Sequence, residues 1–177
     1  MKWTEGSIIR AISRQTLNRK CTVLVDNCSW TGHECDVLAV TDDLRIIDVE
    51  VKISRSDLKA DAKKDKWWHR DSWRFGQPEP APVARVWPPK VWKHYYAMPA
   101  EIWGEALFEF LPSPASGVLV LRGGDDKPIR VECVRRATPN KDATRLVAPQ
   151  VMQIARLANL RMWEAYERAE QRAMVEA

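Results

Sequence analysis

The sequence predicts a mixed αβ fold in which helices flank one central mixed sheet. An amphipathic helix precedes three consecutive strand-like segments, a second helix follows them, and further strand-like segments lead to a long C-terminal helix. The predicted order is therefore α-β-β-β-α-β-β-β-α. The 177 residues are enough for one domain with a substantial core, so we expect a single domain over residues 1–177.

The first four elements follow from periodicity and capping. Thr4 can cap a helix that runs to about Asn18, because Ile8, Ile9 and Ile12 have helical spacing. Strand-like patterns then occupy residues 21–30, 33–40 and 44–53, with turns at Thr31-Gly32 and at residues 41–43. Short connections between consecutive strands predict an antiparallel meander.

The remaining elements lie on either side of a Pro-rich segment. Ser54, with Asp57 three residues later, fits a capping box and predicts a helix to about Trp73. The Pro-rich loop over residues 76–89 is expected to hold no regular structure. Three strands follow at 91–98, 118–121 and 129–134. A helix then starts at about Pro149, with an apolar stripe formed by Val151, Ile154, Ala158, Met162, Ala165 and Ala169.

The charge and composition of the chain exclude few classes of function. The net charge of +4 permits a polyanionic partner without demanding one. No apolar run approaches the roughly 20 residues that span a membrane, and the segment MKWTEGSIIR lacks the features of a signal peptide. We therefore expect a cytoplasmic protein with no membrane segment and four free thiols, placed as small buried residues. No two cysteines form a CxxC pair, so their spacing argues against a zinc site.

Ionisable residues stand out on two apolar strands. Side chains alternate across a strand, so one face of residues 44–53 carries Ile47, Val49, Val51 and Ile53, and the other carries Leu44, Ile46, Asp48, Glu50 and Lys52. Glu34 and Asp36 share a face of the preceding strand. Charged groups in such a setting are costly unless they are paired or bind metal. Carboxylates on adjacent strands can chelate Mg²⁺ or Mn²⁺, and a neighbouring lysine can orient the attacking water or stabilise a phosphate.

Asp36, followed on the next strand by Glu50-Val51-Lys52, resembles the PD-(D/E)XK nuclease superfamily. The stretch EVKISRSDLKADAKKDKW also resembles bacterial and phage DNA-repair and recombination members. The resemblance covers about residues 4–98 and implies a restriction-endonuclease-like αβββαβ core, with extra strands over 99–148 and a C-terminal helix over 149–177. Cys35 departs from the pattern, because it stands where the superfamily name has Pro.

The resemblance implies an Mg²⁺- or Mn²⁺-dependent deoxyribonuclease with Asp36, Glu50 and Lys52 as its catalytic centre. Asp36 and Glu50 would be metal ligands together with the backbone carbonyl of Val51, and Lys52 would be the catalytic lysine. Glu5 matches a carboxylate that many members carry on the first helix, so it is a further candidate ligand; the alternative is an acid that favours the helix dipole. Glu34 and Asp48 either support the metal ligands by hydrogen bonding or are exposed charges at strand ends.

Basic and aromatic residues come after the predicted catalytic residues in the sequence. At about 100° per residue, one stripe of the second helix would carry Lys59, Lys63, Lys66 and Arg70. We interpret this stripe as a nucleic-acid-binding surface, the alternative being a solvated face. Trp67, Trp68 and Trp73 either stack on unpaired bases or pack under the Pro-rich loop. Tyr95 and Tyr96 alternate across a strand, so one should be core, and His69 and His94 are expected to be structural or exposed.

The leading interpretation is a metal-dependent nuclease that acts on DNA in repair, recombination or phage DNA processing. One alternative is a non-catalytic DNA-binding subunit of a repair complex on the same fold. Another is a protein-interaction module whose tryptophans and Pro-rich loop form the interface. The three motif residues could also be a structural ion-pair cluster. A homodimer through the C-terminal helix stays open, as do repair or recombination partner proteins.

Overall fold

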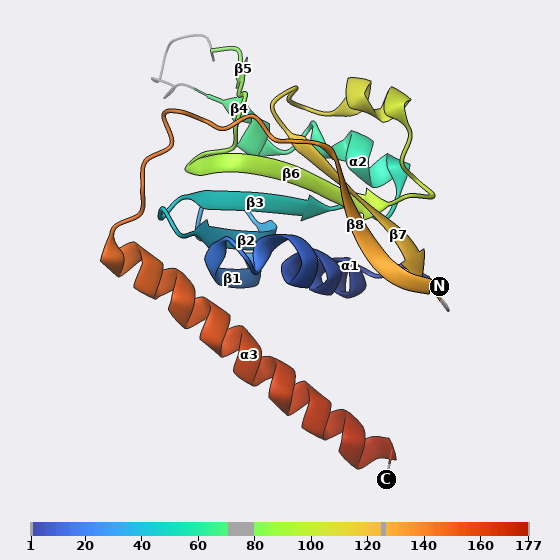
Figure 1. Cartoon of the computed structure of the whole chain (residues 1–177). Helices are drawn as coiled ribbons and strands as arrows, with labels where there is room; N and C mark the ends of the chain where they lie inside the picture. Colours follow the sequence, from blue (N-terminus) through green and yellow to red (C-terminus); the bar gives the residue numbers. More distant parts are fainter. Residues whose placement is uncertain (1, 71–79, 125–126, 177) are drawn as a thin grey trace.

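The computed structural model describes residues 2–70, 80–124 and 127–176 (Figure 1). A six-stranded mixed sheet has the order β1-β2-β3-β6-β7-β8. Its strands are β1 (Cys21–Cys28), β2 (Cys35–Thr41), β3 (Ile46–Val51), β6 (Val91–Pro99), β7 (Gly117–Gly124) and β8 (Lys127–Arg135). The pairs β3/β6 and β6/β7 are parallel, and the others are antiparallel. With helices on both faces and the order αβββαβ over the first part of the chain, the predicted mixed αβ fold class is confirmed.

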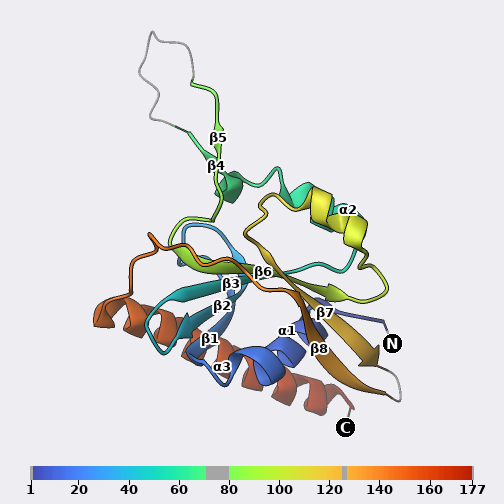
Figure 2. The same cartoon turned by 45° about the horizontal axis from the view of Figure 1, so that its top comes forward.

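Helix α1 (Glu5–Ile12) covers one face of the sheet (Figures 1 and 2). The Thr4 hydroxyl accepts a hydrogen bond from the Ser7 backbone N–H at 3.2 Å, so Thr4 caps the helix as predicted. Ile8 and Ile12 are fully buried against Val37, Val49 and other residues of β2 and β3. A π-helical turn, Ser13–Leu17, continues the helix almost to the predicted end.

Two separate clusters cover the opposite face. Near β1, Leu38, Val40 and Ile46 pack with Ile154 of α3 (Ala148–Glu176). Near β6 and β7, the core joins α2 (Arg55–Asp61) to the 3₁₀ helix η3 (Glu105–Phe110) through Leu58, Tyr96, Met98, Leu107, Val118 and Val120. Asp48 and Glu50 alternate with the apolar residues of β3 and so lie between the two clusters.

The second helix ends earlier than predicted. It stops at Asp61, and the chain continues as a 3₁₀ turn η2 (Asp65–Trp67) and a short strand β4 (Trp68–His69). The reason is tertiary: the side chains of Lys66 and Trp67 turn inward and are buried, so their interactions override helical periodicity. The predicted helix end, Trp73, lies outside the described residues.

The Pro-rich segment was predicted to hold no regular structure, and this is wrong for two residues. Strand β5 (Val83–Ala84) pairs with β4 in an antiparallel ladder. It lies between Pro82 and Pro88, where backbone N–H groups can donate. Figure 2 shows this pair projecting from the body of the molecule.

Strand β3 is shorter than residues 44–53. Leu44 has a positive φ of 63° and belongs to the preceding turn. Lys52 follows the strand, but its backbone N–H donates to the Ala97 carbonyl at 2.9 Å, which keeps it beside β6. Ile47, Val49 and Val51 form the predicted core face, whereas Ile53 is 52% exposed because the sheet has ended.

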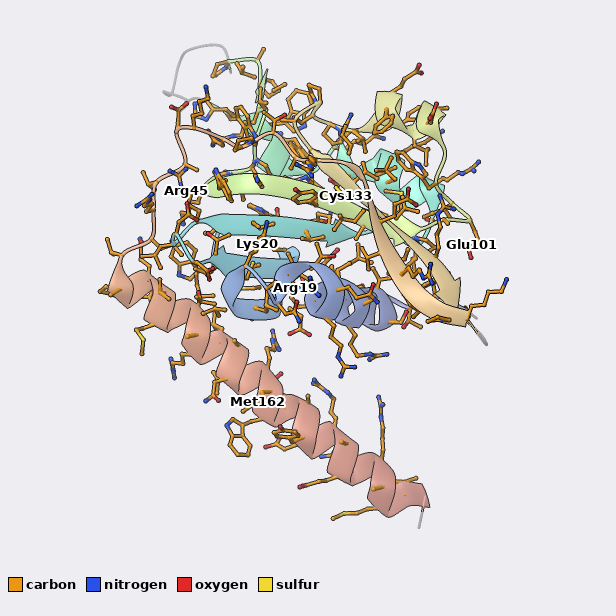
Figure 3. The ribbon with its side chains drawn as sticks, viewed as in Figure 1. Arg19, Lys20, Arg45, Glu101, Cys133 and Met162 are labelled. Carbon is orange, nitrogen blue, oxygen red and sulfur yellow. The ribbon has the colours of Figure 1, made fainter. Side chains whose placement is uncertain are left out.

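Helix α3 continues past the strand that supports it. Val151, Ile154 and Ala158 pack against the sheet as predicted, but Met162 is 43% exposed. Figure 3 labels Met162 on the helix, where side chains extend into solvent. The predicted apolar stripe is therefore buried only along its first part. Within the described ranges, no helix combines the length and apolar character needed to cross a bilayer.

Candidate active site

Asp36 and Glu50 approach each other from neighbouring strands. Asp36 is the second residue of β2, and Val37 beside it lies opposite Val49 of β3. The Asp36 Oδ2 accepts a hydrogen bond from the Val51 backbone N–H at 2.6 Å. Burial, and after it the negative charge of Glu50, raises the pKa of Asp36 to about 7. The Asp36 carboxylate is thus held against the backbone next to Glu50, where the charge of Glu50 acts on it.

Three lysine ammonium groups surround the fully buried Glu50 carboxylate. Lys66 Nζ lies 2.6 Å from Oε1, while Lys52 Nζ and Lys64 Nζ lie 3.0 and 3.2 Å from Oε2. Burial alone would raise the pKa of Glu50, but the cations of Lys66 and Lys52 hold it below its ordinary value. Glu50 is therefore a buried, ionised carboxylate with partners on both oxygens.

Asp61, at the end of α2, is a second carboxylate that forms ion pairs with the same lysines. Its Oδ1 lies 3.1 Å from Lys52 Nζ and 3.0 Å from Lys64 Nζ. Its Oδ2 accepts hydrogen bonds from the Trp67 indole at 3.0 Å and from the Tyr96 hydroxyl at 2.5 Å. Burial opposes ionisation, but Lys66, Lys52 and the two donors hold the pKa of Asp61 well below its usual range. Lys52 is therefore clamped between Glu50 and Asp61.

The other predicted carboxylates occupy three different settings. Glu5 is exposed at the start of α1, yet its charge still contributes to the raised pKa of Asp36. Glu34 is exposed and precedes β2. Asp48 is fully buried, so it is no exposed strand-end charge, and its Oδ2 lies 3.1 Å from His33 Nε2. The structure thus gathers Asp36, Glu50, Val51 and Lys52, and leaves Glu34 outside.

The predicted basic stripe does not form, because α2 ends before three of its four members. Lys59 is exposed on α2, with Nζ 4.0 Å from the centre of the Phe110 ring. Lys63 is exposed in the following turn, and exposed Arg70 lies 3.8 Å from Asp65. Lys66 is only 5% exposed and pairs with Glu50. It is therefore part of the buried cluster, not of a surface for phosphates.

The structure tests several of the predictions made for the tryptophan and tyrosine side chains. Tyr96 is fully buried, which confirms that one of the two adjacent tyrosines is core. Trp67 is 2% exposed and packs edge-on against the buried His94, with ring centroids 4.9 Å apart. Trp68 is half-buried and donates to the Ala62 carbonyl. Trp67 therefore belongs to the core and has no free face for a base.

Sequence reasoning missed Asp61 and Lys64. One sequence signal could have identified Asp61. Asp61 comes three residues after Leu58, so the two side chains share a face of the helix. Leu58 is the apolar residue that packs into the core. An acid on the core side of a helix needs buried partners. No comparable pattern marks Lys64, which reaches the site from a turn.

The burial of Asp36, together with the charge of Glu50, leads to a stability prediction for the metal-free protein. The Asp36 pKa is about 7 when folded and about 3.9 when unfolded. The folded state therefore retains the proton more tightly, and stability falls as pH rises through this window. Asp36→Asn removes that penalty and keeps an acceptor for Val51. Since Asp36 is partly exposed, we expect a gain of only about 1 kcal/mol at pH 8 in EDTA.

Thermal unfolding between pH 5 and pH 8 in EDTA measures this effect. The difference in melting temperature between Asp36→Asn and the natural protein should grow with pH. Asp142→Asn, at an exposed position, serves as the matched control and should show no such trend. A difference that does not depend on pH would show that Asp36 carries no such penalty.

Comparison with known proteins supports the fold alone. No protein-family model matches the chain, and no curated protein matches it. Among solved structures, the chain is similar to SPO1766, a protein of unknown function from Silicibacter pomeroyi, at 22% sequence identity and a TM-score of 0.57. The match covers 96% of each chain. It therefore spans nearly the whole chain, and it assigns no activity.

Proposed function

We propose that this protein is a metal-dependent nuclease that hydrolyses phosphodiester bonds in DNA, with Asp36, Glu50 and Lys52 at its centre. The proposal rests on the neighbouring positions of Asp36 and Glu50: the Asp36 carboxylate accepts from the Val51 backbone N–H at 2.6 Å, and burial, followed by the like charge of Glu50, raises its pKa. A divalent cation between them would relieve this repulsion. Both side chains, and the proposed Val51 carbonyl ligand, offer oxygen donors, which suit Mg²⁺ or Mn²⁺. Glu5 is a further proposed ligand, since its charge also acts on Asp36.

The site can accommodate such an ion if one of the three lysine side chains moves away from the Glu50 carboxylate. Glu50 is engaged by three ammonium groups, so a cation must share the carboxylate with them. The Lys64 side chain is 49% exposed, whereas those of Lys52 and Lys66 are 3% and 2% exposed. Lys64 is therefore the one of the three that can turn into solvent, which would break its ion pairs with Glu50 and Asp61. Once displaced, its ammonium is available to a DNA phosphate.

In this proposal the Lys52 ammonium group donates a hydrogen bond to the reacting phosphate. A bound Mg²⁺ or Mn²⁺ would polarise the phosphate and lower the pKa of a bound water. Burial alone would lower the Lys52 pKa, but the charges of Glu50 and Asp61 raise it above its ordinary value. Lys52 therefore stays an ammonium group, and it orients water or stabilises phosphate charge by donation. Asp61 positions it through the 3.1 Å ion pair.

Cleavage assays test the proposal. Linear, nicked and branched DNA would be incubated with the purified full chain in Mg²⁺, Mn²⁺ or EDTA. We expect cleavage that requires a divalent ion and stops in EDTA, and the preferred DNA shape would indicate whether repair or recombination intermediates are the substrate. Absence of cleavage on every DNA would contradict the proposal.

A non-catalytic DNA-binding subunit is the second candidate, and one observation favours it. Glu50 and Asp61 are already neutralised by buried lysines, so the cluster is stable without metal. This function predicts salt-sensitive DNA binding that survives Glu50→Gln and is not accompanied by cleavage.

The proposed setting is DNA repair, recombination or phage DNA processing in the cytoplasm. Repair or recombination proteins are the proposed partners. The exposed part of α3, which includes Met162 and Trp163, offers a surface on which a second copy could pair. Mass measurement in solution decides whether the protein is a homodimer.

A further inference from the structure

A second group of metal-binding donors lies beside the site described above. His33 and Cys35 come from the end of the β1–β2 connection and the start of β2, and Asp48 comes from the middle of β3. One donor atom from each residue lies within 4.8 Å of the other two. Cys35 and Asp48 are fully buried, and the His33 side chain is 11% exposed. Nitrogen, sulfur and oxygen donors therefore converge inside the protein.

Two of the separations in this group suit a tetrahedral ion. His33 Nε2 lies 3.1 Å from Asp48 Oδ2 and 3.7 Å from Cys35 Sγ. With metal bonds of about 2.0 Å to nitrogen and oxygen and about 2.3 Å to sulfur, these separations correspond to angles of roughly 100° and 120° at the ion. Both lie within about 10° of the tetrahedral value, so one ion can bind His33 together with either neighbour. The Cys35 and Asp48 donors lie within 4.8 Å of each other, and they must come within about 4.3 Å, the sum of the two bond lengths, for the ion to bind all three.

Unpartnered polar atoms point to the same place. Asp48 Oδ1 and His94 Nε2 are buried and have no hydrogen-bond partner among the described residues. Both residues are fully buried, and His94 Nε2 lies 3.9 Å from Asp48 Oδ2. Buried polar atoms without partners are costly, and a cation bound by the Asp48 carboxylate would lower that cost. His94 lies beside Asp48 but is not one of the three converging donors.

We propose that His33, Cys35 and Asp48 form a site for Zn²⁺ or a similar thiolate-binding divalent ion, with His94 beside it. The thiolate distinguishes this site from the oxygen donors of Asp36 and Glu50, because Mg²⁺ does not favour sulfur. The ion would link the β1–β2 connection to β3 immediately before Asp36. Its role would be structural, and it would hold Asp36 in position. The proposal does not depend on nuclease activity.

The cysteines form no CxxC pair, which is the spacing that would indicate zinc from sequence. In the fold, a single cysteine lies close to a histidine two residues earlier and to an aspartate from the neighbouring strand. Lys66 is the cation that opposes the site, since its charge acts on Asp48. Its ammonium is itself paired with Glu50 at 2.6 Å, which reduces that opposition.

Cobalt substitution tests the proposal without an activity assay. The full chain, stripped with EDTA, would be titrated with Co²⁺ and then with Zn²⁺. We expect one equivalent of Co²⁺ to give tetrahedral visible bands and a thiolate-to-cobalt charge-transfer band, both lost when Zn²⁺ displaces it. Cys35→Ser should abolish the charge-transfer band, and His33→Ala should weaken Co²⁺ binding by at least about tenfold. Cys133→Ser, at an exposed thiol on β8, should leave the bands unchanged.

Glu50→Gln separates this proposal from the nuclease proposal. That variant should keep the cobalt bands, because Glu50 is not among the three donors. Circular dichroism in EDTA would verify that each variant folds, and His33→Ala provides a second test if Cys35→Ser does not. A titration without a charge-transfer band, or a band that Cys35→Ser retains, would overturn the proposal.

Discussion

Lys52→Ala is expected to slow metal-dependent DNA cleavage by about 10²–10³-fold, the usual cost of removing one preorganised donor. Lys52 is held by Glu50 and Asp61 at 3.0 and 3.1 Å, so its ammonium has a fixed position beside the proposed metal ligands. The effect should appear in the rate at saturating DNA, because the group acts on the reacting phosphate. Single-turnover cleavage in Mg²⁺ measures it.

The fold should survive this substitution. Glu50 and Asp61 each keep Lys64 and Lys66 as partners, so no carboxylate is left alone. Lys141→Ala, at an exposed loop position, is the matched control and should leave the rate within about twofold. Equal rates for Lys52→Ala and the natural protein would remove Lys52 from the proposed mechanism.

Asp61→Ala is expected to destabilise the protein by about 3–5 kcal/mol, which is typical when one partner of a buried ion pair is removed. Lys52 and Lys64 would each lose a carboxylate, and Trp67 and Tyr96 would lose their acceptor. In a chain of this size the melting temperature should fall by roughly 6–20 °C. Thermal unfolding at pH 7 measures the loss.

The neighbouring Asp65 provides the control. Its side chain is 95% exposed and lies 3.8 Å from Arg70, so Asp65→Ala should leave the melting temperature almost unchanged. If both variants behaved alike, the buried cluster would contribute nothing to stability, and the account of how Lys52 is held would be wrong.

Strand periodicity was the most informative property of the sequence. Alternation placed Glu50 opposite the core face formed by Ile47, Val49 and Val51, and the short turn after β2 made Asp36 and Glu50 neighbours. These inferences need only local rules, since an antiparallel meander fixes which strands are adjacent. The mixed αβ fold and the placement of Asp36 and Glu50 on adjacent strands were therefore predictable.

Interactions between distant residues were not predictable in this way. Helical periodicity was extended past Asp61, but Lys66 turns inward to reach Glu50, 16 residues earlier in the chain. That pairing depends on where the turn after α2 places the lysine. Likewise, the contact between His33 and Asp48 depends on the path of the β1–β2 connection. Local patterns do not contain this information.

The most direct test of the central claim is the rate at which Glu50→Gln cleaves DNA in Mg²⁺, compared with the natural protein prepared in parallel. The substitution keeps the shape of the side chain and removes the charge that a metal ion needs. We predict a loss of at least about 10³-fold in a variant that still folds. Cleavage by Glu50→Gln at the natural rate would contradict the account, because the active site would then lie elsewhere.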